Sequence, residues 1–341
     1  MKLNTVDDVK TLYSAATAAA ALGTAIESGL LWLLAEKPVS APEIVRALGI
    51  PGMRGYYWLQ LLEDIGILEN GPGGYSPSNL ARQAILETWS EDSWKHLVAD
   101  ERERIAGVSN LALHIREPGS IRADQGFPAA INYVEKMRND PARAREFTRM
   151  LFEVHQPLAK AVSELLDELL DWTGVQHLMD LGGGSGVVSM ALLRKHPALR
   201  ATVVDMENVC LAGREIAAEQ GLADRIRYHP AEFVHDEFPA GFDLILKCDV
   251  SVFGVWLYKK LWRALKPGGR LVFVEHLSVS ETSAPPTRVA WTFLDSLENP
   301  DFRIPTLAEV QSMLVEAGFE VLPGQHTFGS GWVVFQVQKG S

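Results

Sequence analysis

The chain has 341 residues, more than a typical domain of about 100–200 residues, so two domains are expected. Hydrophobic residues make up 47% and charged residues 22%, which excludes a disordered or fibrous chain, and the net charge of −11 disfavours nucleic acid and anionic membranes as partners. Two cysteines exclude a disulfide framework and a zinc site built on thiolates; together with the lack of a signal-peptide pattern, this predicts a cytoplasmic protein.

Residues 1–110 are expected to form short helices followed by a hairpin. The segment Ser14–Leu34 is rich in Ala and Leu and almost uncharged, which predicts a helix buried on more than one side and packed against another subunit. Ser40 and Glu43 have the spacing of a capping box, Met53–Ile65 supplies another amphipathic helix, and residues 66–77 suggest strand, turn and strand. We expect a winged-helix-like domain that forms a homodimer.

Many winged helices bind DNA, so a DNA-binding regulator is an alternative interpretation of this domain. Residues 1–110 contain 9 Lys and Arg against 14 Asp and Glu, a net charge of −5. Contact with phosphates requires clustered cations, and the expected recognition helix has Arg54 but also the acidic residues Glu63 and Asp64. A DNA-binding regulator is therefore the weaker alternative, and a dimerisation module is the better interpretation.

Residues 111–172 are expected to be helical, with runs at Phe127–Met137 and Ala142–Leu170. The second run is amphipathic and leads directly into the next domain, so it is predicted to form a lid or wall of an acceptor pocket. The most apolar stretch of the chain, Ala15–Ala35, is interrupted by Glu27 and is too short for a membrane span.

Residues 173–341 alternate between strand and helix patterns. This alternation predicts an α/β fold, a Rossmann-like, doubly wound, mostly parallel sheet of seven strands. The expected strands are Gln176–Leu181, Ala201–Asp205, Ile226–His229, Phe242–Lys247, Arg270–Glu275, Phe319–Pro323 and Trp332–Gln338.

A glycine loop follows the first of these strands. Gly182, Gly184 and Gly186 allow a sharp turn and close approach of a ligand, but a dinucleotide fingerprint would need its third glycine at 187, which is Val. Asp205 ends the second strand, 19 residues after Gly186, where an acid suits two ribose hydroxyls. Together with Asp180 and the turn at residues 265–269, the loop indicates a nucleoside cofactor.

On these residues the chain resembles the class I S-adenosylmethionine-dependent methyltransferases of the plant-type small-molecule O-methyltransferase family, which join a winged-helix dimerisation domain to a Rossmann-like catalytic domain. The resemblance implies S-adenosylmethionine as cofactor, S-adenosylhomocysteine (SAH) as product and a small organic acceptor. Met206 would lie against the adenine and Glu232 near its amine, although Met206 and Phe233 are also compatible with core packing. The residues implied to contact the cofactor are Asp180, Gly182, Gly183, Gly184, Gly186, Asp205, Met206, Glu232, Phe233 and Lys247.

The sequence departs from this family at the general base. The family places a His in an H-D-W stretch after the fourth strand, and here Ser251 or Val252 stands in its place. Of the two acids that flank this His, Glu275 fits the first and Ile304 occupies the position of the second. Proton transfer needs only reach and a suitable pKa, so the candidate substitutes are His276, His155 and Asp249.

A second explanation is that no base is needed, because a thioether, an ionised acid or an activated carbon attacks the methyl group directly. The sequence therefore predicts methyl transfer to oxygen, sulfur or carbon, with a cofactor-retaining enzyme that does not methylate as the alternative. The nine histidines show no close-spaced metal-ligand pattern, so no metal is expected. Possible pocket residues are Phe127, Tyr133, Phe147, Phe152, Trp291 and Phe293, and a carboxylate could be anchored by Arg122, Arg288 or Arg303.

Overall fold

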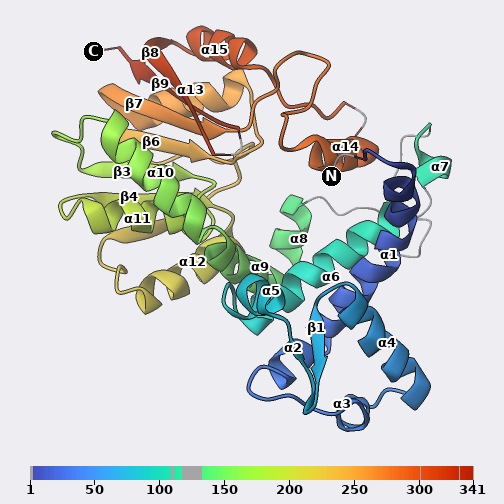
Figure 1. Cartoon of the computed structure of the whole chain (residues 1–341). Helices are drawn as coiled ribbons and strands as arrows, with labels where there is room; N and C mark the ends of the chain where they lie inside the picture. Colours follow the sequence, from blue (N-terminus) through green and yellow to red (C-terminus); the bar gives the residue numbers. More distant parts are fainter. Residues whose placement is uncertain (1–2, 109–110, 117–132, 300, 330, 341) are drawn as a thin grey trace. The chain divides into compact units, whose positions relative to one another are not determined.

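The computed structural model describes residues 3–108, 111–116, 133–299, 301–329 and 331–340. The chain divides into two compact units, residues 1–109 and 110–341, coloured along the sequence in Figure 1. Most of the predicted run Phe127–Met137 lies outside the described residues. In the part of the chain that is described, no helix combines the length and apolar character needed to cross a bilayer.

The first unit is helical with one small hairpin. The predicted capping box is present, with Ser40 preceding α3 and Glu43 bonding back to it, and the hairpin follows α4 as predicted. The prediction of one helix over Ser14–Leu34 is wrong, because Gly29 adopts a φ of 73° and separates α1 from α2. The elements are α1 Val6–Glu27, α2 Leu30–Leu33, α3 Ala41–Ala47, α4 Gly52–Asp64, β1 Leu68–Gly71, β2 Gly74–Pro77, α5 Asn79–Ala81, a π-helical turn Arg82–Leu86, and α6 Glu91–Val108.

The second unit is built on a mostly parallel seven-stranded sheet, as predicted, in the order β5-β4-β3-β6-β7-β9-β8. β9 alone runs antiparallel to its neighbours β7 and β8. The last hairpin is longer than predicted, because β8 continues through a register shift near Pro323 instead of ending there. The strands are β3 His177–Leu181, β4 Arg200–Asp205, β5 Ile226–Pro230, β6 Phe242–Cys248, β7 Leu265–Glu275, β8 Phe319–Phe328 and β9 Trp332–Lys339.

Helices cover both faces of this sheet (Figure 1). Apolar residues of α10, α11 and α12 form one core with the sheet, and those of α13 and α15 form a second core on the opposite face. The helices of this unit are α7 Leu111–His114, α8 Tyr133–Asn139, α9 Pro141–Val154, α10 Gln156–Leu169, α11 Val187–Lys195, α12 Glu207–Glu219, α13 Val255–Ala264, α14 Val289–Glu298 and α15 Leu307–Glu316.

The prediction of one continuous helix over Ala142–Leu170 is wrong. α9 ends at Val154, α10 begins at Gln156, and His155 lies between them as the cap of both. Pro157 is the physical reason, since its nitrogen has no hydrogen to donate to Glu153, but proline is tolerated in the first turn of a new helix.

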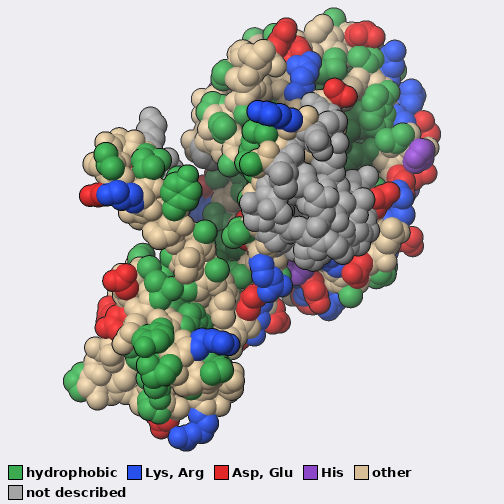
Figure 2. Space-filling view, turned by 90° about the vertical axis from the view of Figure 1, so that its right-hand side faces the viewer, with side chains coloured by type: hydrophobic (Ala, Val, Ile, Leu, Met, Phe, Trp, Pro, Cys, Tyr) green, Lys and Arg blue, Asp and Glu red, His purple; other side chains and the backbone are tan. Residues whose placement is uncertain are grey.

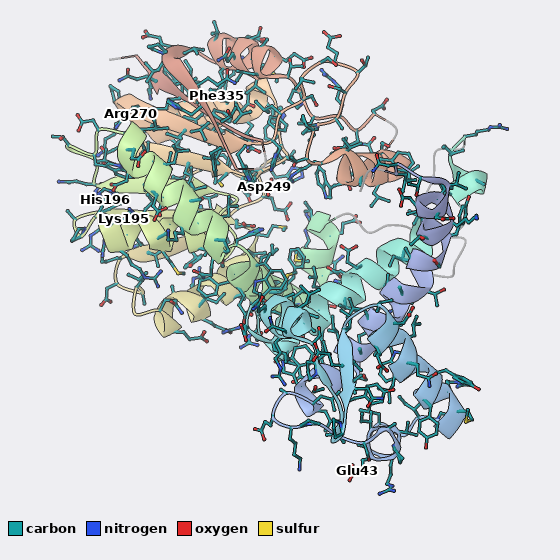
Figure 3. All side chains as sticks on the ribbon, in the orientation of Figure 1. Glu43, Lys195, His196, Asp249, Arg270 and Phe335 are labelled. Atoms are coloured by element: carbon teal, nitrogen blue, oxygen red, sulfur yellow. The ribbon has the colours of Figure 1, made fainter. Side chains whose placement is uncertain are left out.

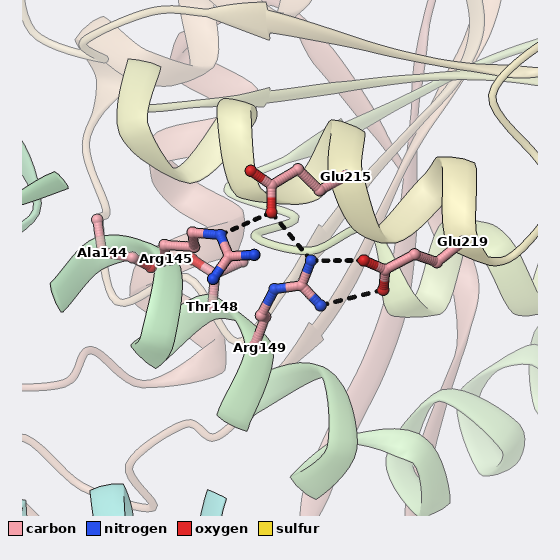
Figure 4. A network of polar contacts seen from close by, with 6 residues as sticks. All are labelled: Ala144, Arg145, Thr148, Arg149, Glu215 and Glu219. Atoms are coloured by element: carbon pink, nitrogen blue, oxygen red, sulfur yellow. Dashed lines mark hydrogen bonds and ion pairs between the residues drawn. The ribbon is translucent and has the colours of Figure 1, made fainter. Parts of the chain in front are cut away.

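A charged network attaches α9 to α12 (Figure 4). The Arg149 guanidinium donates to Glu219 at 2.7 and 3.0 Å and to Glu215 at 2.9 Å, and Arg145 Nε donates to Glu215 at 2.7 Å. The helix that ends at His155 is thereby fixed to the sheet unit through bidentate contacts, whose fork geometry adds orientation to the attraction.

Candidate active site

Most of the predicted site residues lie in the last residues of adjacent parallel strands or directly after them. β3 lies between β4 and β6, and β6 pairs with β7. Figure 3 shows Asp249, which follows β6, on the opposite side of the sheet from Arg270 in the middle of β7. Open parallel sheets place their ligands at this carboxyl edge.

The glycine loop packs tightly against the sheet on one side. Gly182, Gly184 and Gly186 have φ values of 64°, 57° and 76°, a region that side chains rarely occupy. A Cβ on Gly183 would stand 2.4 Å from the Asp180 carboxyl carbon, whereas a Cβ on Gly184 would meet no described atom within 4 Å. The backbone at Gly184 therefore faces open space in which a ligand can approach it.

Two buried carboxyl groups flank this open side. Asp205 Oδ2 accepts a hydrogen bond from the Gly184 N–H at 2.9 Å, its Oδ1 accepts one from the Met206 N–H at 2.7 Å, and burial raises the pKa of Asp205 to about 6. Asp180 accepts a bond from the Ser189 hydroxyl at 2.7 Å, and burial raises its pKa to about 7. An ionised Asp205 next to an open backbone fits the ribose hydroxyls of a nucleoside.

The other predicted cofactor residues lie around the same edge. Met206 packs against a small cluster formed by α8, α9 and α12. Phe233 lies 3.5 Å from the position that a Gly182 Cβ would take. Both carboxylate oxygens of Glu232 pair with the Arg138 guanidinium, at 2.9 and 2.8 Å, so the acid predicted near the adenine amine already has a partner from α8.

Lys247 and Glu275 form a buried ion pair. They are 0% and 2% exposed, and Lys247 Nζ donates to Glu275 Oε1 at 2.5 Å. The same carboxylate oxygen accepts the Val250 N–H at 3.0 Å, and Lys247 also donates to the Val250 carbonyl. Burial raises the pKa of Glu275 to about 7 and lowers the pKa of Lys247. The cofactor contact predicted for Lys247 and the catalytic role predicted for Glu275 require access to a ligand, and neither side chain is accessible in this structure.

The turn that this pair holds connects the predicted catalytic residues to the glycine loop. Asp249 has a φ of 56°, the one described non-glycine residue with positive φ, and its carboxylate accepts a 2.7 Å bond from Arg288. Val250 lies so close to Gly182 that a Cβ on that glycine would stand 2.8 Å from a Val250 methyl group. Asp249 is therefore held directly beside the loop.

The charges of Asp249 and Arg288 act on two of the predicted bases, His155 and His276, and these two histidines differ in their hydrogen bonds. The half-buried His155 ring makes no hydrogen bond to any described residue, and burial lowers its pKa, opposed by the charge of Asp249. His276 is buried against Trp332, with 3.9 Å between ring centroids, and its ring bonds to the Thr287 hydroxyl at 3.2 Å and to the backbone of Gly331. Burial lowers its pKa as well.

Sequence reasoning did not identify which arginine belongs to this site. Arg303 lies outside the cluster and pairs with Glu309, Arg122 lies outside the described residues, and Arg288 bonds to Asp249. No local sequence pattern indicates that Arg288 pairs with Asp249, since 39 residues separate the two.

The aromatic residues expected to line one pocket belong to different cores: Phe152, Trp291 and Phe147 each pack in a separate cluster. Within the described ranges no three His, Cys, Asp or Glu side chains gather as a metal site.

Comparison with known proteins identifies a family. Residues 119–320 match the model of the O-methyltransferase domain. The chain is 28% identical over 310 residues to 3-hydroxy-5-methyl-1-naphthoate 3-O-methyltransferase of Streptomyces sahachiroi (87% of this chain, 84% of that protein), and 26% identical over 321 residues to L-tyrosine C(3)-methyltransferase of Streptomyces lavendulae (91% and 86%). The solved structure of PigF with SAH superimposes with a TM-score of 0.83 at 19% identity, covering 98% and 100% of the two chains, a likeness of fold.

Replacing Asp205 by Asn is expected to raise the dissociation constant of SAH by about 10- to 100-fold, the value of one or two hydrogen bonds to a charged group. The pKa of Asp205 is raised to about 6, so its carboxylate becomes protonated as the pH falls below that value. SAH affinity of the unmodified protein should therefore decrease from pH 7 to pH 5, and that decrease should be smaller in Asp205→Asn. Isothermal titration calorimetry measures both, with the exposed Asp224→Asn as control; equal affinities would contradict the site.

Replacing Lys247 by Met is expected to lower the free energy of unfolding by about 3–5 kcal/mol, because Glu275 remains buried without its partner. The double variant Lys247→Met/Glu275→Leu should recover most of this loss, since no unpaired charge is left. Urea unfolding measures the three proteins. The matched control is Lys266→Met, which breaks the pair of an exposed lysine with the half-buried Asp243; because Asp243 keeps the N–H groups of Gln176 and His177 as partners, this variant should cost less than about 1 kcal/mol. An equal cost for both single variants would show that the buried pair anchors nothing.

Proposed function

Because the chain belongs to the O-methyltransferase family, we propose that it methylates a hydroxyl group of an aromatic acceptor, bound beside the glycine loop at the carboxyl edge of the sheet. The cofactor of this methyl transfer is S-adenosylmethionine. The contact between Val250 and Gly182 carries the proposal, because it joins the predicted cofactor loop to the turn that bears Asp249.

Two relatives support the aromatic acceptor. One is named for the 3-O position of a hydroxynaphthoate and the other for carbon 3 of L-tyrosine, so both names specify a hydroxylated aromatic compound. The rings of Trp291 and Trp332 lie near Arg288, with 5.3 and 5.5 Å between the guanidinium carbon and the ring centroids. Trp332 is buried, and the half-buried Trp291 provides a flat apolar surface of the kind that such an acceptor would contact.

In the proposed reaction the chain binds, orients and deprotonates the acceptor. Bound S-adenosylmethionine supplies an electrophilic methyl group: the O–CH3 bond forms as the S–CH3 bond breaks, and SAH remains. Asp205 and the Gly184 backbone would hold the nucleoside, and the buried Lys247–Glu275 pair keeps the Asp249 turn in place. The hydroxyl proton would pass to a nitrogen of His155.

His155 is the preferred base because its ring is available. Its lowered pKa leaves the imidazole neutral at pH 7, and the negative charge of Asp249 favours the imidazolium that forms on proton uptake. His276 is engaged by the Thr287 hydroxyl and the Gly331 backbone, which favours a structural role. A neutral ring without a hydrogen-bond partner among the described residues, whose protonated form is stabilised by the charge of a carboxylate, has the properties that general base catalysis needs.

Replacing His155 by Asn is expected to lower kcat for a naphthol or phenol by about 100-fold or more, the contribution of a general base. The His155 pKa lies below 6.5, so the rate of the unmodified enzyme should hold at pH 7 and fall as the pH drops below that pKa. Transfer of labelled methyl groups, measured across pH for a panel of phenols, naphthols and thioethers, tests this.

The matched control is His276→Asn, which should keep kcat within tenfold and retain the fall in rate at low pH. An unchanged kcat in His155→Asn would remove the assignment of the base. If the rate of His276→Asn instead no longer falls at low pH, His276 is the general base.

We also propose that the first unit is a winged-helix-type module that forms a homodimer. The first half of α1 carries several apolar side chains that are exposed between its charged ones: Tyr13 is 85% exposed, and Val6, Val9 and Leu12 are exposed as well. Figure 2 shows hydrophobic side chains on the surface of this unit. An apolar helix face of this kind is typical of an interface.

Light scattering should therefore give twice the mass of the chain, about 75 kDa, and Leu12→Glu/Tyr13→Glu should shift the protein toward the monomer because charges oppose burial in an interface. The control Leu80→Glu changes an exposed hydrophobic residue outside α1 and should leave the mass unchanged. A monomeric unmodified protein would contradict the proposal.

A further inference from the structure

The Arg288 side chain is held rigidly at the proposed acceptor side. Its Nη2 donates to Asp249 at 2.7 Å, and the guanidinium lies near the rings of Trp291 and Trp332. The side chain is 23% exposed, so it is neither sealed in the core nor free in solvent. An arginine fixed by an ion pair and two aromatic rings loses little further freedom when it binds a ligand.

Most of the hydrogen-bonding capacity of this guanidinium is unused. An arginine carries five N–H donors in a planar fork, and Asp249 is the one hydrogen-bond acceptor found for Arg288 among the described residues. None of its nitrogens is both buried and unpartnered in that part of the chain, so the remaining donors reach accessible space. A donor fork with a free edge suits a planar anion with two acceptor oxygens.

Two other arginines of this unit are already engaged. Arg138 pairs with both oxygens of Glu232, and Arg303, which is 54% exposed, pairs with both oxygens of Glu309. Arg288 combines a free donor edge, partial burial and an ion pair with Asp249, and the charges of both residues act on His155.

We propose that Arg288 binds a carboxylate of the acceptor, so that the substrate class is an aromatic hydroxy acid. This inference rests on the proposed function for the identity of the site. The charges agree with it: Asp249 balances Arg288 and both histidines are neutral, so a carboxylate would add one negative charge, and a bound sulfonium cofactor carries one positive charge. The half-buried Trp291 ring beside the guanidinium suits the aromatic body of the same molecule.

The test measures binding of two ligands that share one ring system and differ in a single group, the carboxylate of 6-hydroxy-2-naphthoate and the neutral amide of 6-hydroxy-2-naphthamide, to the SAH-saturated full-length protein. The unmodified protein should bind the naphthoate about 10- to 100-fold more tightly than the amide, because a charge-assisted bidentate contact exceeds a neutral one by that factor. Arg288→Met should abolish this preference, so that both ligands bind with similar affinity. Arg288→Lys should keep part of it, since the charge remains and the fork is lost.

The control Arg303→Met should keep the full preference. Equal weakening of both ligands in Arg288→Met would show that Arg288 only supports the Asp249 turn, and absence of a preference in the unmodified protein would overturn the inference outright. Methyl transfer is measured separately on the same pair of ligands. If binding prefers the carboxylate through Arg288 but no methyl group is transferred, the proposed reaction is contradicted and the carboxylate site is supported. If methyl groups are transferred but binding shows no such preference, the carboxylate site is contradicted and the proposed reaction is supported.

Discussion

The buried ion pair of Lys247 and Glu275 is the interaction on which the arrangement of the site depends. Removing two charges from water is costly, and the cost is offset only when each charge has a partner and the remaining donors and acceptors are satisfied. Here Lys247 donates hydrogen bonds to Glu275 and to the Val250 carbonyl, and Glu275 also accepts a hydrogen bond from the Val250 N–H. The turn after β6 is therefore defined by the core of the sheet, and Asp249 adopts its left-handed conformation as a consequence.

Several features of the site follow from the position of this turn. Val250 is placed against Gly182, so the loop after β3 and the turn after β6 form one continuous edge. Asp249 presents its carboxylate to Arg288, 39 residues later in the chain, and its charge also acts on His155. A polar cluster made from distant segments is thus assembled around one buried pair, without a motif that could be recognised in the sequence.

The helix that carries His155 is positioned by different means. Pro157 prevents α9 and α10 from forming one rod, and the network of Arg145 and Arg149 with two glutamates of α12 fixes α9 to the sheet unit. The residue between the helices is left with an unpaired ring. The break between α9 and α10, which the amphipathic pattern does not reveal, therefore determines where His155 lies. In one straight helix the direction of this side chain would be set by the helical repeat.

What the sequence determined by itself is local and repetitive. The seven strands follow from alternating strand and helix patterns, the capping boxes at Ser40 and Thr306 from side chains within one turn, and the glycine loop from conformations that only glycine adopts at low cost. Only the tertiary structure decided which charged groups meet: that Lys247 pairs with Glu275, that Glu232 pairs with Arg138, and that Arg288 rather than Arg303 joins Asp249. The physical reason is that local patterns depend on neighbours along the chain, whereas the partner of a buried or half-buried charge depends on which segments the folded sheet brings to the same edge.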